Sequence, residues 1–239
     1  MIELLQKVLD AHGGLERWSR FTTLNATIVT GGELWGIKSV SQDTVPREMT
    51  VSLHQQRASV TPFGKPDWRT VFRADYISIE TTQGEIVRER SNPREAFAGH
   101  VMDTPWDPLH RAYFSGYAMW TYLTTPFFMA MPGFSVNEIT PWQEGQERWR
   151  GLRVEFAQDI ASHSRYQDFY FDDDFLLRRH DYHVDVAGGF AAAQYVSDYV
   201  EAQGFRFPTR RRAYLRGADL QPMRERLMVS IDLSDFRLS

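Results

Sequence analysis

The chain has 239 residues, of which 42% are hydrophobic and 24% are charged, and its formal net charge is -4 at pH 7. These fractions are typical of a globular protein and exclude a disordered chain, a collagen and a coiled coil. The absence of Cys excludes disulfide bonds, thiol catalysis and Cys-ligated zinc or iron–sulfur clusters. The mild acidity also argues against a protein dedicated to binding nucleic acids.

The N-terminal residues do not have the pattern of a secretory signal. Residues 1–10, MIELLQKVLD, are charged at three positions and contain no apolar stretch of the required length. The most apolar stretch of the chain, residues 117–134, is interrupted by Pro126 and Pro132. Because proline disrupts a helix, this stretch is a poor membrane span. We therefore expect a cytoplasmic protein without an integral membrane segment.

The first predicted element is a helix, and a run of short strands follows it. Apolar residues at helical spacing cover positions 5–12, and the glycine pair at 13–14 ends the helix. From Thr23 the apolar period changes to two, and glycines 31–32 predict a turn before a strand over residues 33–40. Further alternating runs follow, separated by Pro and Gly turn signals. Since no helix lies between them, these strands are expected to pair antiparallel.

Two helices are predicted to interrupt this meander. A short one begins at Asn92-Pro93 and stops at Gly99. A longer one begins at Asp107-Pro108, where a capping residue precedes proline at the first helical position, and Pro126 ends it. Apolar residues form a stripe along this longer helix, and its opposite face is also partly apolar. We therefore expect it to be covered on most sides.

The sheet is predicted to resume after Pro141. The alternating runs, which bring the total to about ten or eleven strands, are residues 149–156, 164–171, 176–186, 194–200, 207–215 and 227–236. No internal repeat, low-complexity tract or linker divides the chain. We therefore predict one domain over residues 1–239.

No motif for a cofactor or metal is present. The patterns G-x-x-x-x-G-K-[ST], G-x-G-x-x-G after a strand and G-x-S-x-G are all absent. His180 and His183 are three residues apart on a predicted strand, so they point to opposite faces and cannot easily share one ion. Residues 172–174, three Asp, are interpreted as a hairpin turn, and the arginines of residues 206–216 as a solvated outer face. We predict no metal, no cofactor and no nucleic-acid partner.

The most informative constellation is a predicted hairpin formed by residues 162–171 and 176–184. A four-residue loop between the strands places the following side chains on one face: His163, Arg165, Gln167, Phe169, Arg178, His180 and Tyr182. A register error of one residue would move one strand's set to the other face. Buried His, Arg and Tyr need polar partners, so these side chains either satisfy one another or serve a ligand or catalytic pocket.

Three short segments resemble the LolA-like lipoprotein-carrier superfamily. Residues 11–18, AHGGLERW, look like the end of its first helix, where a GG-x-x-x-W pattern precedes a β-meander. Residues 228–236, MVSIDLSDF, look like its last strand, and YFD with LLRR in residues 170–179 looks like its central hairpin. The resemblance implies an incomplete antiparallel barrel whose helices fill the concave side around an apolar cavity for acyl chains or other hydrophobic ligands. Some cytoplasmic proteins similar to this fold are cofactor-free enzymes of secondary metabolism.

These observations lead to a mainly β (α+β) fold, an open or half-closed antiparallel β-barrel with an N-terminal helix and helices covering the concave face. A curved sheet with a mostly apolar helix is one way to enclose a cavity. The leading function is therefore the binding of a hydrophobic or aromatic small molecule, or an acyl chain, in this concavity. The residues expected to contact the ligand are Trp35, Tyr113, Tyr117, Trp120, Phe127, Phe169 and Arg178.

The alternative is a cofactor-free enzyme that uses the same cavity for a proton-transfer rearrangement, a cyclisation or a hydrolysis. His163 is its expected general acid or base and His180 a second proton carrier, because histidine titrates near neutral pH. Gln167 and Tyr182 would orient a polar group, and Arg178 would hold a carboxylate or enolate with its planar fork. A third class, a scaffold that only binds proteins, would instead expose a large apolar patch.

Overall fold

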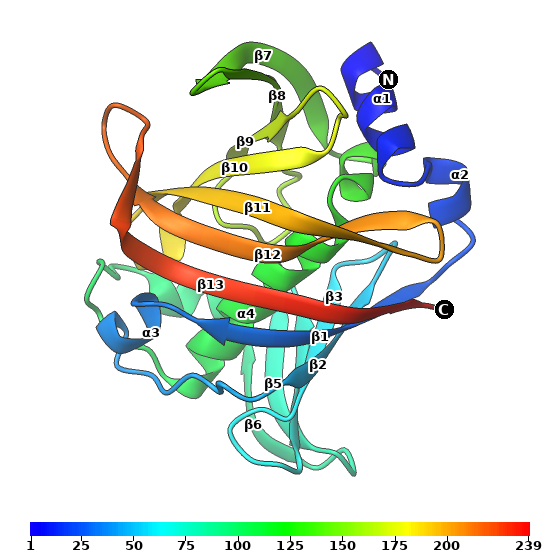
Figure 1. The fold of residues 1–239 in the computed structure, drawn as a ribbon. Coiled ribbons are helices and arrows are strands. Elements are labelled where there is room, and N and C mark those ends of the chain that lie inside the picture. Colours follow the sequence, from blue (N-terminus) through cyan, green and yellow to red (C-terminus); the bar gives the residue numbers. More distant parts are fainter.

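One antiparallel sheet dominates the structure, a computed structural model that describes residues 1–239. Its 13 strands follow the order β6-β5-β4-β3-β2-β1-β13-β12-β11-β10-β9-β8-β7. Figure 1 shows this sheet curving around helix α4, with the N-terminal helix α1 near one end. Strands β6 and β7 are the two ends of the order and do not pair with each other, so the barrel stays open. The predicted open antiparallel barrel is confirmed.

Few helices separate the strands along the chain. The strands are β1 Thr23–Gly31, β2 Arg47–Ser52, β3 Arg57–Thr61, β4 Trp68–Arg73, β5 Tyr76–Thr81, β6 Ile86–Ser91, β7 Ser135–Glu144, β8 Glu147–Glu155, β9 Tyr166–Phe171, β10 Leu177–Val184, β11 Phe190–Ala202, β12 Phe205–Arg216 and β13 Pro222–Leu238. The α-helices are α1 Glu3–Ala11, α2 Leu15–Trp18, α3 Leu34–Ile37 and α4 Pro108–Thr124, and the 3-10 helices are η1 Pro93–Phe97, η2 Phe127–Ala130 and η3 Asp185–Ala187.

The strand predicted over residues 33–40 is wrong, because Leu34–Ile37 form the short helix α3. Gly32 has a φ of 111°, and a Cβ at this position would clash with the carbonyl oxygen of Met228. The chain therefore passes tightly against β13 and leaves the sheet instead of turning back along it. This exit places Trp35 on a helix that covers the concave side.

Strand β7 is missing from the predicted set because Pro141 lies inside it. A proline cannot donate a ladder hydrogen bond, so it signals a turn or an edge strand rather than a central one. β7 is an edge strand, and its register with β8 shifts between Ile139 and Trp142, next to the proline. The bulge and the free edge together accommodate the ring.

Helix α4 begins and ends where its capping and proline signals predict. The Asp107 side chain accepts a hydrogen bond from the backbone N–H of His110, and the backbone N–H of Asp107 donates one to the His110 side chain, which completes a capping box. Fifteen of its 17 residues are buried, as expected for a helix that is apolar on most sides. A Cβ on Gly116 would lie only 2.5 Å from Cγ of Phe72, so this glycine lets the helix pack closely on β4.

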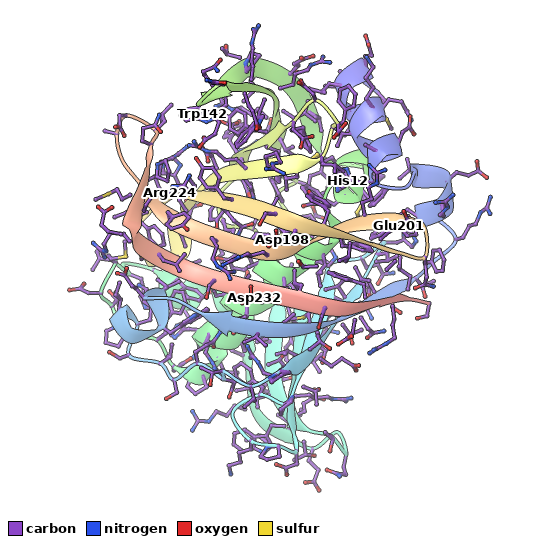
Figure 2. The ribbon with its side chains drawn as sticks, viewed as in Figure 1. His12, Trp142, Asp198, Glu201, Arg224 and Asp232 are labelled. Atoms are coloured by element: carbon purple, nitrogen blue, oxygen red, sulfur yellow. The ribbon has the colours of Figure 1, made fainter.

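A buried ion cluster lies on the outer face of the sheet, opposite to α4. Arg179 donates two hydrogen bonds to Asp181, at 2.7 and 2.8 Å, and Arg216 donates a third at 2.7 Å. The Arg179 guanidinium lies 3.9 Å from both the Trp142 ring centroid and the Glu144 carboxylate. Figure 2 shows Trp142 at this end of the sheet, on β7. The cluster therefore joins β7, β10 and β12 across strands that are not all neighbours in the sheet.

Candidate functional site

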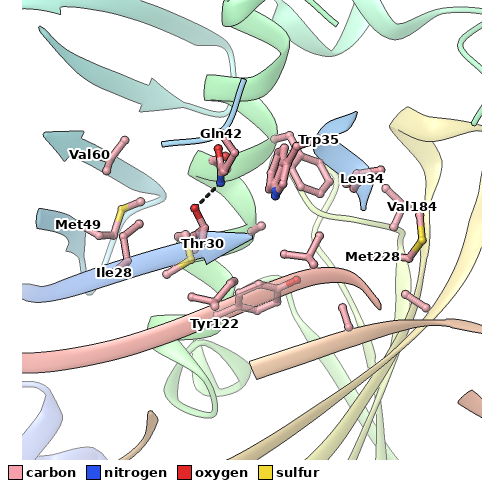
Figure 3. Close-up of a pocket in the computed structure, with 18 of the residues that line it drawn as sticks. Ile28, Thr30, Leu34, Trp35, Gln42, Met49, Val60, Tyr122, Val184 and Met228 are labelled. Atoms are coloured by element: carbon pink, nitrogen blue, oxygen red, sulfur yellow. Dashed lines mark hydrogen bonds between the residues drawn. The ribbon is translucent and has the colours of Figure 1, made fainter. Parts of the chain in front are cut away.

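An apolar cavity lies between the concave face of the sheet and helices α3 and α4 (Figure 3). Seventeen of its 21 lining residues are hydrophobic, and strands from both halves of the sheet contribute. Its open space measures about 30 Å³, which is room for one water-sized group. Met49, Met119 and Met228 line it, and the unbranched methionine side chain adapts readily to differently shaped neighbours. The lining can therefore widen by rotation of side chains.

Two polar positions interrupt this apolar lining. The first is formed by Tyr122 of α4 and Tyr182 of β10, whose hydroxyl groups lie 2.9 Å apart. The Tyr122 hydroxyl also lies 2.7 Å from Nε2 of His163, and the His163 ring stacks on Tyr182 with centroids 4.2 Å apart. All three side chains are buried. The second polar position is formed by Thr30, Gln42 and Arg47.

His180 and Gln167 form a second buried pair on the same hairpin. His180 Nε2 lies 2.7 Å from Oε1 of Gln167, and Gln167 Nε2 donates to the Ser164 carbonyl at 2.9 Å. The His180 ring stacks on Phe169 with centroids 4.0 Å apart. The structure therefore brings all four predicted catalytic side chains into one buried cluster. Within it, these polar groups largely satisfy one another.

Arg211 completes this network from β12. It donates to Oε1 of Gln194 at 2.9 Å and to the Tyr122 carbonyl at 2.7 Å, and it forms no ion pair with an acidic side chain. The interpretation of residues 206–216 as a solvated outer face is wrong for this arginine, which is only 2% exposed. Alternation along β12 turns Arg211 inward while its neighbour Arg210 stays exposed.

Burial sets the protonation states in this cluster. It lowers the pKa of His163 to about 3 and that of His180 well below 6.5. It also raises the pKa of Tyr122 to about 12 and that of Tyr182 well above 10. All four groups are therefore neutral at pH 7. Such widely separated pKa values disfavour proton transfer from Tyr122 to His163 and favour a hydrogen-bonding role for both.

Three buried polar atoms in or next to the cluster have no hydrogen-bond partner. They are Nδ1 of His163, Nε of Arg211 and the hydroxyl oxygen of Tyr117. The His163 and Tyr117 rings lie 5.0 Å apart. A buried polar group without a partner is costly, so native structures rarely keep one without a reason. Neither His163 nor Tyr117 lines the apolar cavity.

Only some of the residues predicted to contact the ligand line the cavity. Trp35 lines it, and so does Tyr182 from the predicted catalytic set. Four other predicted ligand contacts are buried in the surrounding core and do not line it: Tyr117, Trp120, Phe127 and Phe169. They are held by other core contacts, as when the Trp120 indole donates to the Ser52 and Gln55 carbonyls at 2.9 Å each.

The predicted placement of Arg178 beside His180 is wrong. The register of β10 against β9 shifts between Leu177 and Arg179, so alternation fails at this point. Leu177 is buried instead, and the Arg178 guanidinium lies 3.9 Å from the Asp172 carboxylate. Arg178 is therefore not positioned to hold an anionic group in the cluster.

Tyr113 faces a separate polar pocket of about 550 Å³ at the surface. This pocket lies where two distant parts of the chain approach each other across the open barrel. Arg94 donates to the Ser162 carbonyl at 2.6 Å, and the Gln56 side chain exchanges two hydrogen bonds with the backbone of Ala161, at 2.6 and 2.8 Å. These contacts tie η1 and the turn after β2 to the loop before β9.

Sequence patterns did not identify several residues of the site. Tyr122 lies on the face of its helix opposite to the predicted apolar stripe, so its position carried no signal. The sequence prediction groups Arg211 with the solvated arginines of residues 206–216, and nothing local to β12 signals that it is buried. Thr30, Gln42 and Arg47 meet from a strand end, a coil segment and a second strand, and no local pattern relates such positions.

The structure contains neither a group of metal-ligating side chains nor a helix of membrane-spanning character. No three His, Asp or Glu side chains are grouped so that they could hold a metal ion. None of the helices combines the length and the apolar character needed to cross a membrane.

The fold and cavity define an open β-barrel whose concave side is filled by a helix, and solved structures share this architecture. A LolA superfamily protein from Nitrosomonas europaea matches with a TM-score of 0.55 at 9% identity, covering 98% of this chain and 93% of that one. A domain named for outer membrane lipoprotein sorting, from Vibrio parahaemolyticus, has a TM-score of 0.54 at 10% identity over 99% and 91%. A DUF1329 family protein from Desulfovibrio piger has a TM-score of 0.53 at 10% identity over 100% and 94%.

These likenesses extend over nearly the whole chain and establish a LolA-like fold. The predicted resemblance to this superfamily is confirmed at the level of the fold. No model of a protein family matches the sequence, and no curated protein matches it either. At 9–10% identity the likeness is one of fold, in the arrangement of the sheet and helices.

Proposed function

We propose that the protein binds a hydrophobic small molecule or an acyl chain in the cavity between the sheet and α4. The observation that carries this proposal is the cavity lining, in which 17 of 21 residues are hydrophobic although they come from elements scattered along the chain. Apolar pockets with a few placed polar groups are typical of small-molecule sites. The name of the Vibrio parahaemolyticus structure, which refers to lipoprotein sorting, is in line with a lipid-related ligand.

The cavity is too small for the proposed ligand unless its lining moves. About 30 Å³ is far smaller than an acyl chain, so binding requires the lining to move. The three methionines and the short helix α3 are the parts of the wall best suited to do so, since methionine is flexible and α3 is only four residues long. Ligand binding should therefore be accompanied by a measurable rearrangement around Trp35.

A matched pair of variants on β11 tests the proposal. Ala192 lines the cavity, and its neighbour Ala191 points to the opposite face of the strand. We expect Ala192→Leu to fill the void and to reduce the amount of co-purified apolar ligand at least about threefold, since overpacking displaces a guest. Ala191→Leu should retain the wild-type amount. Native mass spectrometry and organic extraction of protein purified from its host measure the ligand, and circular dichroism confirms the fold.

The absence of any apolar ligand from the wild-type protein, with neither release on extraction nor uptake of an added neutral dye, would contradict the proposal. Equal ligand loss in both alanine variants would also contradict it, because the effect would then not depend on the cavity.

A second candidate function is proton-transfer catalysis in the same cavity. The observation that favours it is that Tyr122 and Tyr182 line the cavity and that their hydroxyls join each other and His163, whose Nδ1 has no partner. In this version Tyr122 replaces His163 as the group that meets the substrate. Because every member is neutral, Tyr122 would donate a hydrogen bond to a substrate carbonyl, and the proton of the adjacent carbon would pass to a water molecule.

Deuterium exchange tests this candidate even while the substrate is unidentified. The co-purified ligand is incubated on the protein in D2O and its mass is measured; catalysis predicts incorporation of deuterium into carbon-bound positions. Tyr122→Phe should abolish this exchange while leaving the ligand bound, since only a hydroxyl is removed. Tyr199→Phe is the control, because Tyr199 is a partly buried tyrosine that donates to the Leu177 carbonyl and does not line the cavity. No incorporation by the wild type would exclude this candidate.

A further inference from the structure

Two arginines share one carboxylate at the second polar position of the cavity. Arg111 of α4 donates to Oδ2 of Asp43 at 3.0 Å, and Nη1 of Arg47 lies 3.4 Å from the same oxygen. Neither arginine forms an ion pair with any other acidic side chain. The side chains of Arg47 and Arg111 are only 4% and 7% exposed, so solvent does not balance the second charge. The cluster of Arg47, Arg111 and Asp43 therefore carries a net charge of +1. Arg47 places this charge at the wall of the otherwise apolar cavity, whereas the Arg111 guanidinium lies over the Phe63 ring.

Hydrogen-bond donors are also in excess at this position. The Thr30 hydroxyl oxygen accepts from both Gln42 Nε2 and Arg47 Nη2, and its own hydrogen has no acceptor in the protein. Nε of Arg47 has no partner either, although it is buried. Figure 3 shows Thr30 and Gln42 together beside the cavity, joined by their hydrogen bond. Because Arg111 in turn donates to Oε1 of Gln42 at 3.0 Å, the amide is fixed with its N–H groups toward Thr30.

We infer that this position binds the carboxylate head of an anionic amphiphile, whose apolar body then lies along the cavity. The inference rests on the proposed binding function and names its ligand class. A carboxylate supplies what the site lacks, namely one negative charge and acceptors for the Arg47 guanidinium and the Thr30 hydroxyl. A neutral ligand such as a hydrocarbon or a glyceride would leave the charge and these donors unsatisfied. The head is compact because the surrounding space is narrow.

The positions of the two polar groups also orient the ligand. The second polar position is formed by Thr30 of β1, Gln42 of the coil segment after α3, and Arg47, the first residue of β2. The first is formed by Tyr122 of α4 and Tyr182 of β10. The residues between them are almost all hydrophobic. An amphiphile held by its carboxylate at Arg47 would direct its apolar body toward the tyrosine pair.

A displacement experiment with matched ligands tests the inference. The neutral dye N-phenyl-1-naphthylamine is bound to the full-length protein and displaced at pH 7.5 by dodecanoate or by dodecan-1-ol, which differ in the head. We expect dodecanoate to bind at least about tenfold more tightly than the alcohol, since a charge-assisted hydrogen bond is roughly twice as strong as a neutral one. Arg47→Met should remove this preference, so that the two affinities lie within about twofold of each other.

Further variants keep the test independent of folding defects. Thr30→Val preserves the shape of the side chain and removes the hydroxyl donor, so the ratio of the dodecanoate affinity to the alcohol affinity should fall about threefold or more. Arg237→Met is the control for loss of an arginine, since Arg237 is exposed and pairs with Glu48 at the surface. It should keep the full preference for dodecanoate. Thermal unfolding of each variant is recorded alongside.

The outcomes separate this inference from the proposed function. Equal affinities for dodecanoate and dodecan-1-ol in the wild type would overturn the carboxylate site and leave apolar binding intact. A preference that persists in both Arg47→Met and Thr30→Val would overturn it as well. If neither ligand displaced the dye, and no dye were bound, both the inference and the proposed function would fall.

Discussion

Lowering the pH from 7.5 to 5.5 is expected to reduce the free energy of unfolding by about 4 kcal/mol through three buried histidines. Burial lowers the pKa of His12 to about 4, that of His163 to about 3 and that of His180 well below 6.5. In the unfolded chain each histidine titrates near 6.5, so the unfolded state gains protons that the folded state excludes. The stability is therefore fully present above about pH 6.5 and is lost as the pH falls below it.

Chemical denaturation at a series of pH values measures this effect. His163→Gln and His180→Gln should each reduce the difference in stability between pH 7.5 and 5.5 by about one third, whatever their effect on stability at pH 7.5. His183→Gln is the control, since His183 is exposed on the outer side of the same strand as His180, and it should keep the full difference. An unchanged pH dependence in both buried-histidine variants would show that these side chains are protonated in the folded state.

Removing the carboxylate of Asp181 is expected to destabilise the protein by about 3–5 kcal/mol. Asp181 is the nearest anion to Arg179, which is fully buried, and it also accepts from the largely buried Arg216. In Asp181→Ala the Arg179 guanidinium stays buried but loses its hydrogen-bonded carboxylate. Only the more distant Glu144 carboxylate then remains near it. Thermal and denaturant unfolding measure the loss, and the outer strand β7 should show increased hydrogen exchange, since Trp142 packs on Arg179.

The neighbouring strand offers a matched control. Asp168 lies opposite Asp181 in the ladder of β9 and β10, and it also receives two hydrogen bonds from an arginine, at 2.7 and 2.8 Å. Its partner Arg153 is half exposed, so Asp168→Ala should cost less than about 1 kcal/mol. The double variant Arg179→Met with Asp181→Leu should recover part of the stability lost in Asp181→Ala, since only Arg216 is then left without its partner. A similar loss for both aspartates would contradict the role of burial.

The sequence by itself determined the class of fold and the main helix. Alternation of apolar and polar residues predicts strands with one buried face. Because no helices lie between these strands and short turns join them, they pair antiparallel. Asp107-Pro108 and Pro126 set the bounds of α4 because capping and proline effects act within one helical turn. The same local logic grouped His163, Gln167, His180 and Tyr182 on one face of the hairpin. These features depend only on residues close together in the chain.

The tertiary structure alone decided which of these residues meet the cavity and what charge the cavity carries. Alternation fixes the face of a side chain only while the register is regular, and the shift between Leu177 and Arg179 sent Arg178 to Asp172 instead of the interior. The burial of Arg211 depends on α4 crossing above β12, since its partner Tyr122 lies 89 residues away in the sequence. Likewise Asp43 and Arg111 lie 68 residues apart, and they form an ion pair only because the curved sheet wraps the segment after α3 around α4. Such contacts bring together residues that are far apart in the chain and therefore close long loops. A local pattern of residues cannot predict them.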